Sequence, residues 1–223
     1  MRFVRDNGLA LFFLFIFLCS AIAESVVGHS VFNEQQLMHG DEAISYGPYL
    51  LSSDFGEAML ENWQSEWLQM LLFALATIWL VQRGSAESKK PGDEGLQSNE
   101  DQQVGRHARA KAPRWARVRG WRRAAYENSF LIVMAVIFLG SWLAQSATAW
   151  TKFNDEQVQH GQAAVSWLTY LGEVDFWETT MQNWQSEFLA LGTMCVLTVY
   201  LRQRGSPESK PVGAPHDETG SSV

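Results

Sequence analysis

The sequence predicts an all-α integral membrane protein with four transmembrane helices, and three observations support this fold class. Charged residues gather at the start, middle and end of the chain, and the long stretches between them carry almost none. Ten Trp and 13 Phe are many for 223 residues, as expected where aromatic side chains lie at membrane interfaces. One pattern also occurs twice, which predicts that the four helices are a tandem duplication of a two-helix repeat.

The repeat is visible without gaps. Adding 121 to a residue number carries the first half onto the second from residue 7 to residue 89. The pentapeptide NWQSE at 62–66 recurs at 183–187, and QRGS followed by ESK recurs at 203–210. Identical polar segments in one register indicate duplication, not low complexity. The predicted parts are a first repeat 1–90, a polar and basic linker 91–124, a second repeat 125–210 and a disordered tail 211–223.

The four predicted spans are of two kinds. Residues 8–27 and 129–150 are each about 20 residues long, enough to cross a ~30 Å hydrocarbon core. The second helix of each repeat is apolar only over 67–81 and 188–201, which covers just ~22 Å. We therefore expect each NWQSE segment to lie partly in the membrane. The first span also resembles a cleavable signal peptide, but its counterpart at 129–150 cannot be one, which favours a retained helix.

The charges predict an orientation. Loops 28–58 and 151–180 hold ten acids against Lys152 alone, while the Arg residues flank the opposite membrane face. Arg and Lys bias loops toward the cytoplasm. Both termini and the linker are therefore expected inside and the two loops outside, with the two repeats parallel and not inverted.

Short amphipathic helices are predicted in the two outer loops. Asn33 and Asn154 begin capping-box patterns, and Gly40 and Gly161 are natural stops for the helices that would follow. Asp54-Phe-x-Glu57 and Asp175-Phe-x-Glu178 are typical of N-caps, so each second long helix is expected to begin there. The first of these helices is expected to end near Arg83.

NWQSE is the strongest candidate for a functional site. Its Asn, Ser and Glu stand at i, i+3 and i+4, so they share one helix face. An ionisable group in a span normally faces a bundle interior or a water-filled cavity, so the two glutamates could form a cation or proton site. The favoured alternative is a polar collar that hydrogen-bonds the helices together. The candidate residues are Asn62, Ser65, Glu66, Asn183, Ser186 and Glu187.

Other chemistry finds little support. His39 and His160 occupy equivalent outer-loop positions and could join the glutamates in a paired metal site, but no usual zinc spacing is present, so no metal or cofactor is predicted. Cys19 and Cys195 are expected to pack in apolar surroundings. Without a P-loop, GxSxG or HExxH, the sequence does not predict an enzyme.

The linker is basic from residue 106 to residue 123. Interleaved Trp115 and Trp121 favour contact with anionic lipid headgroups. A topogenic signal with no further role is the plain alternative, and nucleic-acid binding is not favoured this close to a membrane. The predicted headgroup contacts are Arg106, Arg109, Lys111, Arg114, Arg117, Arg119, Arg122 and Arg123.

The doubled pattern FN-x-x-Q-x-x-HG, DF, NWQSE and QRGS-x-ESK resembles an uncharacterised family of bacterial membrane proteins of actinobacterial type, a domain of unknown function. The resemblance implies a bacterial inner-membrane location and no activity. We expect a structural or accessory membrane protein that contacts the bilayer and a membrane-protein partner or a second copy. The alternative is a small cation- or proton-transporting protein that uses Glu66 and Glu187.

Overall fold

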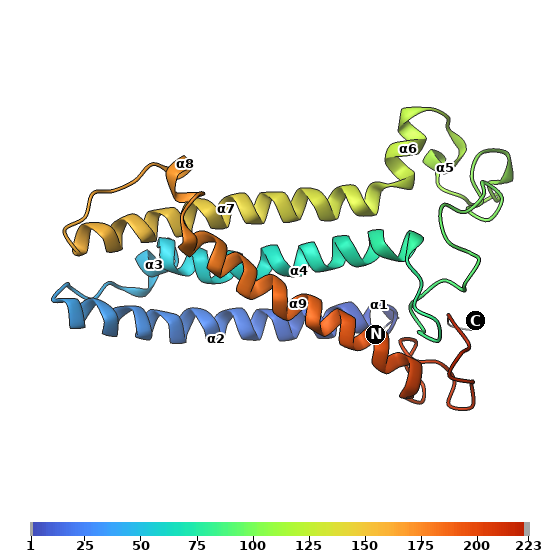
Figure 1. Ribbon diagram of the computed structural model, residues 1–223, viewed down its shortest axis with the longest axis horizontal. Coiled ribbons are helices and arrows are strands. Elements are labelled where there is room, and N and C mark those ends of the chain that lie inside the picture. The colour runs from blue at the N-terminus through green and yellow to red at the C-terminus, as the bar shows by residue number, and fades with distance from the viewer. Residues whose placement is uncertain (1, 221–223) are drawn as a thin grey trace. The chain divides into compact units, whose positions relative to one another are not determined.

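The computed structural model describes residues 2–220, and within that range every regular element is helical, which confirms the all-α fold class. Four helices are long and the others are short (Figure 1). The long ones are α2 (Gly8–His39), α4 (Ser53–Trp79), α7 (Ser129–Gln159) and α9 (Val174–Tyr200). The short ones are α1 (Arg2–Asp6), α3 (Tyr46–Tyr49), the 3-10 turn η1 (Gly105–His107), α5 (Arg114–Arg117), α6 (Trp121–Glu127) and α8 (Trp167–Tyr170).

The chain divides into two compact units, and each combines parts of both sequence repeats. The first unit contains residues 1–60 and 144–172, and the second contains residues 61–143 and 173–223. Helices α4 and α7 contribute to both units. The predicted boundaries at 90, 124 and 210 concern the repeats along the sequence and stay a prediction.

By length and composition, α2 and α7 are the two helices within residues 2–220 that could cross a membrane, not the four predicted. In their most apolar stretches only 6% of the α2 residues and 22% of the α7 residues are buried. Helices α4 and α9 have 27 residues each. They are long enough, but the polar pentapeptide lies within each of them and lowers their apolar content.

The predicted capping boxes are wrong. Helix α2 continues without a break through Asn33 to His39, so Asn33 begins no helix. Its side chain instead clamps the returning chain: Asn33 Oδ1 accepts from the Ile44 amide at 2.8 Å and Nδ2 donates to the Ile44 carbonyl at 3.0 Å. Asn154 holds Val165 in the same way, at 2.8 and 3.0 Å. An amide side chain that spends both polar atoms on a distant backbone cannot also cap its own helix.

The predicted helix stops are correct, although the helices that they end are the long ones. Gly40 adopts the left-handed conformation (φ 88°), and the Asp41 amide donates to the Gln36 carbonyl at 2.9 Å. Gly161 (φ 72°) does the same, with Gln162 donating to Gln157 at 2.8 Å. Both are helix ends that glycine permits without steric cost. The loops do contain short helices, but these are α3 and α8, which begin after the predicted ones would have ended.

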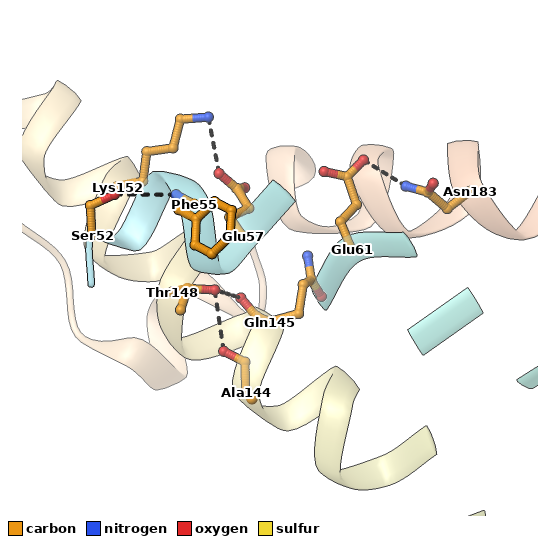
Figure 2. Close-up of polar contacts among 9 residues, drawn as sticks. All are labelled: Ser52, Phe55, Glu57, Glu61, Ala144, Gln145, Thr148, Lys152 and Asn183. Atoms are coloured by element: carbon orange, nitrogen blue, oxygen red, sulfur yellow. Dashed lines mark hydrogen bonds and ion pairs between the residues drawn. The ribbon is translucent and has the colours of Figure 1, made fainter. Parts of the chain in front are cut away.

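The start and end of α4 differ from the prediction by a few residues. The Ser52 hydroxyl, not Asp54, caps the helix by accepting from the Phe55 amide at 3.2 Å (Figure 2). Asp54 lies in the first turn, where a carboxylate favours the positive end of the helix dipole. Helix α4 ends at Trp79, before Arg83. Helix α9 begins after Glu173, with no side-chain cap there, and Asp175 lies in its first turn.

The duplicated QRGS-x-ESK segments are folded turns. Gly84 and Gly205 both have φ 86°. In the first copy Ser88 Oγ accepts from the Gln82 amide at 2.9 Å, and in the second Ser209 Oγ accepts from Gln203 at 2.8 Å. The motif therefore has a structural role, which is to reverse the chain after a long helix.

The lysine of the second turn is buried by the C-terminal tail. Lys210 is 1% exposed, and its ammonium donates to the carbonyls of Pro215, His216 and Glu218 at 2.8–3.0 Å. The Thr219 hydroxyl accepts from the Gly84 amide at 2.8 Å. Residues 211–220 of the tail predicted as disordered are thus held against the second unit, and residues 221–223 lie outside the described residues.

Candidate functional site

Both NWQSE segments are helical, as the sequence predicts, and both belong to the second compact unit. Their serines do not point a free hydroxyl at a ligand. Ser65 Oγ donates to the Asn62 carbonyl at 2.9 Å and Ser186 Oγ donates to the Asn183 carbonyl at 2.9 Å. A hydroxyl that bonds to its own helix satisfies itself locally, so these two serines contribute little to an ion site.

The two segments meet through polar side chains of the second unit. Asn183 Nδ2 donates to Glu61 Oε1 at 2.7 Å (Figure 2), and Trp184 Nε1 donates to Gln64 Oε1 at 2.8 Å. One turn further along, Gln69 Nε2 donates to the Glu187 carbonyl at 3.0 Å. These contacts join α4 directly to α9.

The face of α4 that makes this contact is not the predicted one. Gln64 is fully buried and Ser65 is 2% exposed, whereas Asn62 and Glu66 are exposed. Glu61, Gln64 and Gln69 were not among the residues that the sequence predicted. Glu61, Gln64 and the buried Leu68 stand at i, i+3 and i+7, a spacing that marks one helix face and could have identified the stripe.

The two candidate glutamates lie on the same compact unit. The charges of Glu66 and Glu187 repel each other, with Glu66 exposed and Glu187 half-buried. Within residues 2–220, no group of three His, Cys, Asp or Glu side chains is placed to hold a metal ion. The two carboxylates therefore have no third ligand of those types beside them in the described residues.

His39 and His160 lie on a different site, a cavity of about 830 Å³ in the first compact unit. The cavity lies between the last turns of α2 and α7 and the beginning of α4. The imidazole Nδ1 of His39 contacts the Gln35 carbonyl at 2.8 Å, and that of His160 contacts the Glu156 carbonyl at 2.8 Å. The two histidines therefore meet the rim of one cavity in equivalent geometry, and the glutamates of NWQSE do not line it.

The charges around this cavity are mostly negative. Asp41, Asp54, Asp155 and Glu156 line it, and Lys152 brings the one ammonium. Lys152 Nζ pairs with Glu57 at 2.9 Å (Figure 2). Burial lowers the pKa of Lys152, but the hydrogen bond and charge of Glu57, with Asp54 and Glu156, outweigh it and raise the pKa above its ordinary value. The ammonium form of Lys152 is therefore favoured by its acidic neighbours.

The basic linker is partly tied to itself. Arg123 pairs with Glu127 at 2.6 Å, and Arg117 donates to the carbonyls of Arg109 and Ala110. Trp121 is 73% exposed and has the Arg122 guanidinium 5.6 Å from its ring centre. An exposed Trp beside a cation is the arrangement that headgroup contact needs, and that contact stays a prediction.

Comparison with known proteins gives a family and no activity. Residues 1–221 match the family described as a domain of unknown function (DUF6766). The chain belongs to that family. The expected membership of an uncharacterised family is thus confirmed. No curated protein and no solved structure matches the chain. Function must therefore be argued from the contacts of this family member itself.

Proposed function

We propose that this protein is a multi-pass inner-membrane protein of the bacterial cell, whose four long helices cross the bilayer, and that it acts as an accessory protein and not as an enzyme. The observation that carries the proposal is the exposure of its most apolar helices. Phe15 of α2 is 67% exposed, and Leu139 of α7 is 57% exposed. Soluble proteins do not leave apolar surfaces of helix length open to water.

A soluble core helix and a signal sequence both account for these surfaces less well than a membrane does. A core helix of a soluble protein is mostly buried, whereas 6% of the apolar stretch of α2 and 22% of that of α7 are buried. A signal sequence accounts for an N-terminal helix only, and α7 begins at Ser129. Lipid is therefore the solvent that best accounts for both surfaces.

Helices α4 and α9 fit a crossing because the two large amides of α4 that face α9 have partners there. A 27-residue helix is ~40 Å long, enough for a ~30 Å hydrocarbon core. Gln64 and Gln69 would be costly in lipid if they were unpaired. Gln64 accepts from Trp184, and Gln69 donates to the Glu187 backbone. Polar side chains that bond across helices are tolerated inside a bilayer and hold helices together.

The same contacts favour an accessory function over transport. Asn183, Trp184, Gln64 and Gln69 spend hydrogen bonds on helix packing, and Ser65 bonds to its own helix. These contacts support the polar collar that the sequence favours over an ion site. The exposed apolar surface and the exposed Trp residues of the linker are then available to anionic lipids and to a membrane partner or second copy.

Cysteine accessibility tests the four crossings. In a Cys19→Ser/Cys195→Ser background, single probes are placed at Glu42→Cys, Ser98→Cys and Gln162→Cys. An impermeant maleimide should label the probes at 42 and 162 in intact cells, and the probe at 98 only after permeabilisation. If only α2 and α7 cross, the probe at 98 becomes accessible and the probe at 162 is protected. That pattern, or protection of all three probes, would overturn the proposal.

The accessory role has its own test. The protein is extracted with its surrounding lipid and analysed for bound lipid and protein, in parallel with a variant that lacks residues 106–123. The proposal expects enrichment of anionic lipid or a stoichiometric partner, and loss of lipid enrichment in the deletion variant. Emergence of the protein alone, with no change on deletion, would reject it.

One observation favours the transport alternative, which is the repulsion between the charges of Glu66 and Glu187. Two acids in a span can bind a cation or proton that neither binds alone. In liposomes, the alternative expects cation or proton flux that Glu66→Gln/Glu187→Gln abolishes. Equal flux in the variant and the unaltered protein rejects it.

A further inference from the structure

The cavity of the first compact unit has the properties of a binding site beyond the proposed function. It is open on one side and has a volume of about 830 Å³, which is in the range of sites that hold small organic ligands. Its walls are the turn from Gln35 to His39, the turn from Asp155 to His160 and the start of α4 at Ser52–Asp54. All three walls belong to one compact unit, so the cavity is a property of that unit alone.

Most of the charged side chains that line the cavity are carboxylates, which accept hydrogen bonds. Asp41 and Asp54 come from the first repeat, and Asp155 and Glu156 from the second. The one ammonium of the lining, on Lys152, is already paired with Glu57 at 2.9 Å. Four carboxylates around an open volume create a negative potential that attracts and retains positively charged ligands.

The two histidines add acceptors of a defined kind. A backbone carbonyl can only accept a hydrogen bond, so the Nδ1 atoms of His39 and His160 carry the proton in their bonds to Gln35 and Glu156. In a neutral imidazole the other nitrogen, Nε2, is then an acceptor. Each ring is held by its own helix, and its Nε2 has no hydrogen bond to another residue in the described part of the chain.

We infer that this cavity is a binding site for a small linear polyamine. Such a ligand carries several ammonium groups separated by short alkyl segments. Its N–H groups can donate hydrogen bonds to the carboxylates and to the imidazole Nε2 atoms. Its alkyl segments can pack against Phe32, Met38 and Val158, which line the same cavity. A single metal ion fits less well, because no three of the His, Cys, Asp and Glu side chains within residues 2–220 converge on one point.

The repeat supplies a matched control for the test. Asp54 and Asp155 line the cavity, while their counterparts 121 residues away, Asp175 and Glu34, do not. The variant Asp54→Asn/Asp155→Asn and the control Asp175→Asn/Glu34→Gln therefore remove the same number of charges from the same two positions of the repeat. Only the first changes the cavity.

The experiment is calorimetric titration of spermine into the full-length protein in nanodiscs of uncharged phosphatidylcholine. We expect one spermine per chain, weaker binding at higher salt, and about a hundredfold weaker binding to Asp54→Asn/Asp155→Asn, about tenfold for each carboxylate. The control should bind within about twofold of the unaltered protein, because its charges lie outside the cavity. Magnesium at the same concentration should compete poorly.

A second pair of variants keeps the test decisive if the double Asn variant fails to fold. Gln159 lines the cavity at an exposed helix end, and Gln162 lies three residues beyond it, outside the lining. Gln159→Lys should weaken spermine binding about tenfold, and Gln162→Lys should not. The inference is overturned if spermine gives no heat, if both members of a pair lose affinity equally, or if magnesium binds as tightly. Because the titration does not depend on orientation in a membrane, its failure would leave the four-crossing proposal standing.

Discussion

The two outer loops show which features of the repeated segment are retained when side chains change. His29 and Trp150 are repeat counterparts, and each ring nitrogen lies 2.8 Å from the equivalent carbonyl, of Ile44 and of Val165 respectively. Tyr46 and Trp167 are also counterparts, and each reaches the hydroxyl of an equivalent serine, at 2.6 and 3.2 Å. The polar contact is kept at each position while the ring that makes it is replaced.

The two loops differ in the contacts that they make with neighbouring helices. Lys152 pairs with Glu57 across the first compact unit, but the counterpart positions hold Val31 and Glu178, which cannot form that bond. Gly56 similarly lies where a Cβ would come 2.9 Å from Thr148 Cγ2, whereas its counterpart is Trp177. The residues that the repeats share therefore determine the hydrogen bonds within each loop. Single differences between the repeats determine which side chains outside the loop it can contact.

The largest effect is expected from the asparagine clamps. Asn33→Ala and Asn154→Ala each remove two hydrogen bonds and leave a backbone amide unpaired, at a cost of about 2 kcal/mol, while the Ile44 and Val165 carbonyls keep their contacts with His29 and Trp150. Hydrogen exchange at the Ile44 and Val165 amides should accelerate about thirtyfold, each only in its own variant. The exposed neighbour Gln35→Ala is the control. Unequal effects at the two clamps would show that the two loops differ in stability although they make the same hydrogen bonds.

A smaller effect is expected where the loops differ. Gly56→Ala should destabilise the first unit by about 1–2 kcal/mol, because the new Cβ meets Thr148 Cγ2. Thr148→Ser removes that methyl group and keeps the hydroxyl that donates to the Gln145 carbonyl at 3.0 Å. Thermal unfolding of Gly56→Ala/Thr148→Ser should therefore recover most of the loss. Absence of recovery would show that the approach of Gly56 to Thr148 is not the constraint.

The smallest effect concerns Glu87 and Glu208, repeat counterparts that meet in the second unit. Burial first, then the hydrogen bond and charge of Glu208, raises the pKa of Glu87 to about 7. The contact of protonated Glu87 is therefore fully favourable below pH 4.5, its ordinary pKa, and is lost as pH rises through 7 and Glu87 ionises.

Glu87→Gln cannot ionise, so it should be more stable than the unaltered protein at pH 8, by about 1 kcal/mol or less because the site is partly solvated. Below pH 4.5 the two should unfold together, because Glu87 is then protonated in both the folded and the unfolded state. The thermal midpoint at each pH, with the exposed Glu100→Gln as control, measures this difference. A difference that does not change with pH would contradict the raised pKa of Glu87.

The sequence could predict what depends on local chemistry. Gly40 and Gly161 are helix stops in both the sequence and the structure, because a left-handed residue is a local requirement that glycine meets. The NWQSE residues are helical for the same reason of local pattern. The prediction for Asn33 was wrong because asparagine can either cap a helix or bind a distant backbone segment. Only the position of Ile44 in the fold distinguishes these two roles.

The sequence pattern could not predict contacts between distant segments of the chain. Asn183 bonds to Glu61 and not to its own counterpart Asn62, so the two repeats do not meet symmetrically in the second unit. Nothing in a repeat of period 121 predicts such an offset. The cavity was missed likewise: the sequence placed His39 and His160 at equivalent positions, but not the acids that surround both.

The ammonium of Lys210 is held by three backbone carbonyls of the tail, and no side chain of the tail takes part in those bonds. Almost any sequence could supply such oxygens, provided that the chain continues far enough past Lys210 to fold back. For the burial of Lys210, the constraint on this tail is therefore its length and not its composition. Relatives with unrelated tail sequences can keep the same anchor, and a stop codon just after Lys210 would remove it although no side chain in contact with the ammonium is lost.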